Sequence, residues 1–169
     1  MINGLEIDQF DIPEAYYLIH RGDDGEVNGS TRLMTTDGPY LLGDVFPEMI
    51  KDQTPPRTNA IWESTRFCAD NQTAPRQIAG ILMAGMLEFA LAMGIRNYVS
   101  VSDIRMETII RRAGWATRRM GDVQSTGKEM SAAEWFEVSQ QDYNNVCAKT
   151  QISGPVITNL NHLNIERAA

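Results

Sequence analysis

The segment AIWESTRFCAD, residues 60–70, places a glutamate and an arginine close together in a run that otherwise predicts a β-strand. Glu63 and Arg66 fall on opposite parities of this strand, and neither parity is uniformly apolar. A positioned carboxylate can accept a proton from a reacting group, and a guanidinium can hold a carboxylate through paired hydrogen bonds. We therefore expect one or both charges to face a cleft that other charged side chains line.

Further charged residues precede this strand: Asp8 and Asp11 lie in GLEIDQFD, and Arg32 lies in STRLMTT. Charged side chains on neighbouring strands often form ion pairs that have no catalytic role. Asp8 and Asp11 by themselves would indicate no more than a solvated turn. Their occurrence together with Arg32, Glu63 and Arg66 favours a polar substrate site over isolated ion pairs.

These motifs, in this order, resemble those of the acyl-homoserine-lactone synthase family, the LuxI-type autoinducer synthases. The resemblance rests on GLEIDQFD, STRLMTTDGPYLLGDVFPEM and WESTRF, and the later segments AGW and ISGPV add to it. It extends from about residue 4 to residue 156. The residues that match the motifs of the family are Glu6, Asp8, Asp11, Arg32, Phe46, Glu63 and Arg66.

The resemblance implies transfer of an acyl chain from acyl carrier protein, or from coenzyme A, to the amine of S-adenosylmethionine. The methionine carboxylate then closes the lactone and methylthioadenosine leaves. The protonated amine must first lose a proton, which makes Glu63 the expected general base. Thr65 matches a hydroxyl position beside the acylation site, and no cofactor or metal is implied. The polar network expected around S-adenosylmethionine consists of Asp8, Asp11, Arg32 and Arg66.

An acyl chain needs an apolar pocket, and the methionine-rich helix expected over residues 74–94 could supply one wall. Met83 and Met86 are the candidates, because methionine adapts to irregular apolar shapes, although ordinary core packing is the alternative for each. Phe46 is either core or part of the acyl pocket. Relatives that prefer 3-oxo chains are expected to carry Thr at the position of Val99, so this aliphatic residue suggests no polar partner at C3 of the chain.

Arginines are concentrated in the segment 105–119 of an otherwise acidic chain, whose net charge is −7. Helix capping and a solvated face could explain them. The resemblance instead implies a docking patch for the acidic acyl carrier protein. The segment APRQIAGIL is a poor match to a pyrophosphate loop, which favours a carrier-protein donor over coenzyme A. The candidate docking residues are Arg105, Arg111, Arg112, Arg118 and Arg119.

The elements that must position these residues follow from hydrophobic periodicity and from turn and stop signals. Strands at 15–22 and 30–36 should form a hairpin, and the segment between residues 37 and 59 should be irregular. The order of elements predicts an α/β or α+β protein with a GNAT-like acyltransferase fold, a mixed, mostly antiparallel twisted sheet flanked by helices. The remaining expected elements are strands at 60–70, 97–103, from residue 115 and at 134–139, and helices at 74–94, 104–114 and 140–151.

The bulk properties of the chain narrow its class. Its 169 residues fit a single domain, 1–169, and its net negative charge argues against general nucleic-acid binding. Glu88 interrupts the longest apolar run, so we expect no stable membrane insertion, and the first residues do not resemble a secretory signal. Cys68 and Cys147 form no disulfide framework. We expect a cytoplasmic protein.

The sequence departs from the family at its start. Members of the family carry a longer N-terminal segment, with an arginine, a phenylalanine and a tryptophan of the S-adenosylmethionine pocket, whereas this sequence begins shortly before Gly4. We therefore expect weak binding of S-adenosylmethionine by the chain as given. Two alternatives stay open: another GNAT-like N-acyltransferase that uses a different amine, and a non-catalytic shortened paralogue that binds acyl carrier protein or acyl chains.

Overall fold

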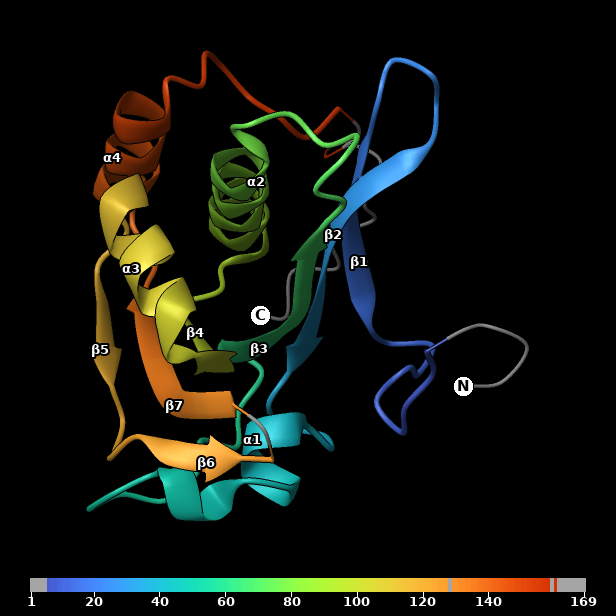
Figure 1. Cartoon of the computed structure of the whole chain (residues 1–169). Coiled ribbons are helices and arrows are strands. Elements are labelled where there is room, and N and C mark those ends of the chain that lie inside the picture. Colours follow the sequence, from blue (N-terminus) through green and yellow to red (C-terminus); the bar gives the residue numbers. More distant parts are fainter. Residues whose placement is uncertain (1–5, 128, 159, 161–169) are drawn as a thin grey trace.

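The computed structural model describes residues 6–127, 129–158 and 160. Strands in this part of the chain form one sheet in the order β1-β2-β3-β4-β7-β5, and β6 pairs with β7. The pairing of β3 with β4 is parallel and the other pairings are antiparallel, which confirms the predicted fold class (Figure 1). The strands are β1 (Tyr16–Arg21), β2 (Val27–Thr35), β3 (Ile61–Ala69), β4 (Asn97–Asp103), β5 (Thr117–Arg119), β6 (Gln124–Thr126) and β7 (Glu129–Glu137).

Helices cover the two faces of the sheet unequally (Figure 1). Three longer helices pack on one face, here called the helix face, and two short ones cover part of the opposite face, here called the α1 face. Each face has its own buried apolar cluster, and β3 and β4 contribute to both. No helix in the described ranges is long and apolar enough to cross a membrane. The helices are α1 (Leu41–Asp44), the 3₁₀ helix η1 (Pro47–Met49), α2 (Ile78–Met93), α3 (Ile104–Ala113) and α4 (Gln140–Thr150).

Local sequence signals explain where the helices stop. Helix α2 ends at Gly94 and α3 ends at Gly114, and both glycines adopt the left-handed conformation, with φ of 72° and 89°. The Asp103 side chain caps the start of α3 by accepting the Arg105 N–H at 2.7 Å.

The predicted hairpin is confirmed by the antiparallel pairing of β1 and β2. The sequence did not predict β6, α1 or η1.

A β-bulge in β3 resolves the unusual charge pattern of this strand. Ser30 pairs with Cys68 and Arg32 pairs with Thr65, so β3 advances by one more residue than β2 over this interval. Arg66 lies in the bulge with a φ of 51°, in the left-handed region. The bulge resets the alternation of side chains, so that Arg66 joins the contacts that Thr65 makes on the α1 face, while Phe67 packs on the helix face.

Strands β3 and β4 separate soon after they begin. Their pairing covers only Ile61–Glu63 against Asn97–Val99. From Ser64 onward, β3 has no register partner on β4. A gap therefore opens in the middle of the sheet, and Glu63 is the last residue of β3 before it.

Candidate active site

Four of the predicted charged residues form one cluster on the α1 face beside the gap. Arg32 Nη1 donates to Asp8 Oδ1 and to Asp11 Oδ1, both at 2.7 Å. Arg66 Nη2 donates to Asp8 Oδ2 at 2.9 Å and reaches Asp11 Oδ2 at 3.4 Å. Arg32 Nε also donates to Thr65 Oγ1 at 2.9 Å. We call Asp8, Asp11, Arg32 and Arg66 the acidic–arginine cluster.

A tight turn between Asp8 and Asp11 sets the relative orientation of their carboxylates. The Asp8 N–H donates to Asp11 Oδ2 at 2.8 Å, and the Asp11 N–H donates to the Asp8 carbonyl at 3.2 Å. This turn presents both carboxylates on the same side. It thereby lets the buried Arg32 side chain, which is 1% exposed, contact both of them.

Asp8, Asp11 and Arg32 keep their charges at neutral pH. Burial alone would raise the pKa of Asp8, but hydrogen bonds from Arg32 and from the Phe10 N–H outweigh it and keep the pKa below its ordinary value. The Tyr17 hydroxyl and the Asp8 N–H lower the pKa of Asp11 to about 2. Burial disfavours the Arg32 cation, yet its bonds to the two aspartates hold its pKa above the ordinary value.

Arg66 differs from Arg32 in having unused hydrogen-bonding capacity. Its side chain is 21% exposed, and its Nε atom is buried with no hydrogen-bond partner among the described residues. Its positive φ is unfavourable for a residue other than glycine, and strain of this kind is concentrated at functional sites. Glu6 Oε1 lies 3.5 Å from Arg66 Nη1, so a third acidic residue of the motif also lies near this guanidinium. Arg66 is therefore well placed to hold an anionic group.

Glu63 lies apart from the acidic–arginine cluster and has different partners. Its side chain is fully buried, and its two oxygens accept the backbone N–H groups of Leu41 and Leu42 at 2.8 and 2.7 Å. These donors lie at the start of α1. Burial raises the pKa of Glu63 to about 7, although the two backbone hydrogen bonds oppose the rise. A carboxyl group in this state can accept or release a proton near neutral pH.

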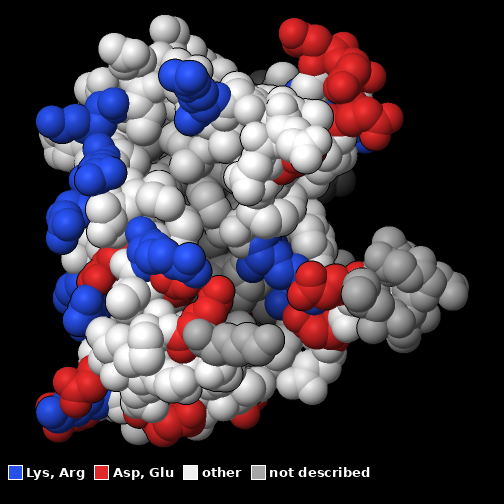
Figure 2. All heavy atoms as spheres, viewed as in Figure 1, with Lys and Arg blue, Asp and Glu red and all other residues white. Residues whose placement is uncertain are grey.

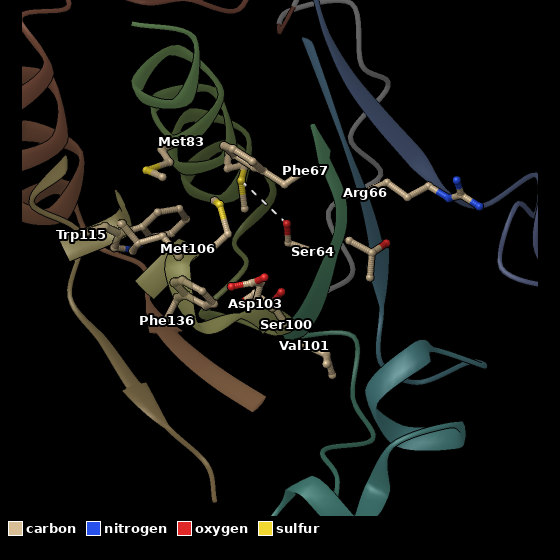
Figure 3. Close-up of a pocket in the computed structure, with 14 residues that line it drawn as sticks. Ser64, Arg66, Phe67, Met83, Ser100, Val101, Asp103, Met106, Trp115 and Phe136 are labelled. Atoms are coloured by element: carbon tan, nitrogen blue, oxygen red, sulfur yellow. Dashed lines mark hydrogen bonds between the residues drawn. The ribbon is translucent and has the colours of Figure 1, made fainter. Parts of the chain in front are cut away.

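A cavity of about 280 Å³ lies between the separating strands on the helix face. Figure 3 shows Phe67 of β3, Phe136 of β7, Met83 of α2, Met106 of α3 and Trp115 pointing into it, while Arg66 points the opposite way. Met86 also lines the cavity. Most of its lining is therefore apolar, as an acyl chain requires.

Several hydroxyl groups interrupt this apolar lining. Ser64, Ser100 and Ser102 belong to the cavity, and Ser64 Oγ donates to Met86 Sδ at 3.9 Å. Val99 is not among the residues that line this cavity and is buried in the apolar cluster of the α1 face. Its neighbour Ser100 lines the cavity. The relation of Val99 to C3 of the acyl chain stays a prediction.

The other predicted site residues are divided between the two faces. Phe46 packs against the apolar cluster of the α1 face and not in the cavity, whereas Met83 and Met86 line the cavity. Thr65 contacts the acidic–arginine cluster and Arg66 belongs to it. Both residues also line the cavity. These two residues therefore lie where the charged cluster and the apolar cavity meet.

The predicted docking arginines lie on α3 and β5, where Figure 2 shows basic side chains along one side of the molecule. Arg105 pairs with Asp103 and Glu129, and Arg119 pairs with Glu107.

The other three predicted docking arginines have fewer contacts with acidic side chains. Arg118 stacks on the Trp135 ring, with its guanidinium carbon 4.9 Å from the ring centroid. Arg111 and Arg112 are exposed at the end of α3 and form no ion pair within the described ranges. They are the two arginines of the segment with the greatest freedom to meet a partner.

Sequence reasoning missed two kinds of site residue. Tyr17 donates its hydroxyl to Asp11, and Phe10 lies under the Arg32 guanidinium with its ring centroid at 5.9 Å. Their proximity to the aspartates in the sequence was the available signal. Ser100 could have been found from the parity of β4, while Trp115 and Phe136 required knowledge of the tertiary packing.

Comparisons with known proteins identify a family for most of the chain. The profile of the autoinducer synthase family matches residues 1–146. An acyl-homoserine-lactone synthase of Agrobacterium fabrum is 31% identical over 164 residues, which cover 93% of this chain and 78% of that protein. Among solved structures, MesI, a CoA-dependent acyl-homoserine lactone synthase, is 30% identical with a TM-score of 0.82, and the match covers 92% of this chain and 78% of MesI.

A second solved structure, TofI in a ternary complex with an inhibitor and MTA, is 29% identical. Its TM-score is 0.75, and the match covers 90% of this chain and 78% of TofI. The alignments with curated relatives cover 61–78% of the length of those proteins. With a family profile matched over most of its length, the chain belongs to the autoinducer synthase family, whose curated members are acyl-homoserine-lactone synthases and hence acyltransferases.

Proposed function

We propose that this chain is an acyl-homoserine-lactone synthase that uses S-adenosylmethionine as the acyl acceptor. The amine nitrogen attacks the thioester carbon of the donor, a nitrogen–carbon bond forms and the thiol leaves. The methionine carboxylate then attacks its own γ-carbon, and methylthioadenosine leaves from the sulfonium centre. The product is an N-acyl homoserine lactone, a quorum-sensing signal.

The observation that carries this proposal is the gap between β3 and β4, which connects a charged cluster on one face with an apolar cavity on the other. The two substrates have matching characters: S-adenosylmethionine is a zwitterionic cation, and the donor carries an aliphatic chain. Thr65 and Arg66 lie at the junction of both regions. The amine and the thioester would therefore approach from opposite faces and meet inside the sheet.

The acceptor side of the proposal assigns complementary roles to the charges. Arg66, whose Nε has no partner among the described residues and whose Nη2 lies beside the two aspartates, would hold the carboxylate of S-adenosylmethionine. Asp8 and Asp11, kept ionised by Arg32, would favour the sulfonium and ammonium charges. Arg32 is buried and fully engaged, so it positions the aspartates and does not bind substrate itself.

Glu63 is the proposed general base. It lies at the apex of the gap, and its pKa of about 7 suits proton transfer from an ammonium group at neutral pH. Both of its oxygens already accept backbone N–H groups, so the proton would travel through one water molecule to a remaining lone pair. The β3 backbone beyond Glu63 has no register partner on β4, so those of its N–H groups that point away from β2 could donate to the thioester oxyanion.

The acyl donor is proposed to be acyl carrier protein, with acyl-coenzyme A as the alternative. Exposed Arg111 and Arg112 on α3 supply positive charge next to the cavity-lining residues Met106 and Ile110 of the same helix. An acidic carrier protein that docks there would have its acyl group beside the cavity. The CoA-dependence of MesI supports the alternative donor.

The test is a reaction of the purified chain with S-adenosylmethionine and either acyl carrier protein or coenzyme A thioesters. The proposal expects stoichiometric formation of methylthioadenosine and an acyl-homoserine lactone, detected by mass spectrometry. An acylated amine formed without methylthioadenosine would identify another N-acyltransferase. Binding of acyl donors without any turnover would indicate a non-catalytic paralogue.

A further inference from the structure

Trp115 occupies a defined position at the end of α3. The Gly114 N–H donates to the Arg111 carbonyl at 3.1 Å, and the Trp115 N–H donates to the Ile110 carbonyl at 3.3 Å. With Gly114 at a φ of 89°, this is a Schellman motif, in which the residue after the glycine packs against the last turn of the helix. Trp115 and Ile110 accordingly both line the cavity.

The Trp115 ring is held firmly on its other sides. Its Nε1 donates to the Glu137 carbonyl at 2.8 Å. Its ring lies 5.2 Å from the Phe136 ring and 6.1 Å from the Tyr98 ring, measured between centroids. The side chain is 2% exposed. An indole held by a hydrogen bond, two rings and a helix terminus has little freedom to move aside for a longer ligand.

Trp115 also lies far from the reacting groups within the cavity. In Figure 3, Arg66 and Trp115 lie at opposite sides of the labelled residues, with Ser64, Phe67 and Met106 between them. A thioester carbon placed in the gap beside Thr65 would direct its alkyl chain away from Arg66. The end of the chain would then approach the indole.

We propose that Trp115 is the specificity-determining residue that limits the length of the acyl chain. This inference rests on the proposed function. The ring closes the apolar end of a cavity of about 280 Å³, so that a chain longer than the cavity must displace an indole that its hydrogen bond and packing hold in place. A single methylene in an apolar pocket changes discrimination by roughly 10- to 200-fold.

The test compares kcat/KM for a series of saturated acyl donors in the wild type, Trp115→Phe and Trp115→Leu. Trp115→Leu should raise the ratio of kcat/KM for the long donors to that for the short donors by about tenfold or more. Trp115→Phe keeps an aromatic ring and should give a smaller shift in the same direction. If Trp115→Leu does not fold, the Phe variant still decides the question.

Trp62 supplies a matched control. It is 6% exposed, belongs to the same apolar cluster, and donates its Nε1 to the Asn59 carbonyl, but it does not line the cavity. Trp62→Leu should lower thermal stability to a similar extent and leave the chain-length ratio unchanged. An unchanged ratio in folded Trp115 variants, or an equal shift in Trp62→Leu, would overturn the inference.

Failure of the proposed function would look different from failure of this inference. A wild type that forms no lactone with any donor would refute the synthase assignment. The length limit would then be read from the affinities of acyl-coenzyme A thioesters for the wild type and Trp115→Leu, measured by calorimetry. If Trp115→Leu binds long thioesters no better than the wild type does, the length limit fails independently.

Discussion

The two faces of β3 differ more than the faces of an ordinary half-buried strand. On the α1 face, Thr65 and Arg66 join a set of ion pairs and hydrogen bonds. On the helix face, Ser64 and Phe67 join methionines and aromatic rings around a cavity. Regular alternation would have placed Arg66 with Ser64, and the bulge prevents this. One irregular residue thus separates a charged site from an apolar one.

The carboxylates of the α1 face differ from one another in turn. Asp11 accepts from the Tyr17 hydroxyl and from two arginines, and its pKa falls to about 2. Glu63 is buried and bonded only to neutral backbone groups, and its pKa rises to about 7. Titratable groups whose environments move their pKa values apart take different roles in a site. In the proposed function, the charges that hold a substrate and the group that takes a proton would therefore be separate residues.

The largest predicted effect is on turnover when Glu63 loses its proton acceptor. Glu63→Gln keeps the shape of the side chain and should lower kcat by roughly 10²- to 10⁴-fold. Glu134→Gln is the matched control, because Glu134 is also buried with a raised pKa but bonds to Ser102 on the helix face. It should change kcat by less than about tenfold. Near-normal turnover in Glu63→Gln would remove this residue from the mechanism.

Arg66→Gly separates stability from substrate binding. Glycine adopts the positive φ of this bulge without strain, so the free energy of unfolding should stay level or rise by about 0.5–1 kcal/mol. The affinity for S-adenosylmethionine should fall roughly 10- to 100-fold, because a charged hydrogen-bonding partner is lost. Gln151→Gly, at a φ of 59° after α4, is the control that should gain stability without changing affinity. Unaltered binding by Arg66→Gly would exclude the assigned carboxylate contact.

A third prediction concerns the pH dependence of stability. The pKa of Glu63 is raised from 4.5 to about 7 by burial, so its contribution to stability is full below pH 4.5 and is lost as the pH rises through about 7. Asp11 acts in the opposite sense: its contribution is present above pH 3.8 and is lost as the pH falls through about 2.

Urea unfolding can isolate the contribution of Glu63. Between about pH 5 and about pH 8, the wild type should lose roughly 1–2 kcal/mol of unfolding free energy relative to Glu63→Gln. A constant difference between the two proteins over this range would mean that Glu63 titrates normally.

The smallest predicted effect is on the choice of donor. Arg111→Glu with Arg112→Glu should reduce kcat/KM for acyl carrier protein several-fold and leave a small thioester mimic unaffected. Added salt should reproduce part of the loss, because exposed charges are screened beyond about 8–10 Å. Arg96→Glu reverses an exposed charge between α2 and β4 and serves as the control. An equal loss with both donors would indicate damaged folding and not lost docking.

The sequence predicted most of the helices and strands, because hydrophobic periodicity and glycine stops mark β4, α2 and α3 clearly. The resemblance to the synthase family also grouped the residues of the acidic–arginine cluster, although Asp8 and Arg66 are 58 positions apart in the chain. The sequence could not predict the bulge at Arg66, whose extra residue becomes visible only against the register of β2. The assignment of Val99 rested on the family resemblance alone, whereas the structure lines the cavity with its neighbour Ser100.

The most direct test of the account compares substrate dependence in one variant from each face. Asp11→Asn weakens the acidic–arginine cluster, and Met83→Ala removes part of the cavity wall. Kinetic constants for S-adenosylmethionine and for the acyl donor are measured in both. The account predicts that Asp11→Asn raises KM for S-adenosylmethionine alone and that Met83→Ala raises KM for the donor alone. If each variant, still folded, raises both constants by the same factor, the two faces do not bind separate substrates and the account is contradicted.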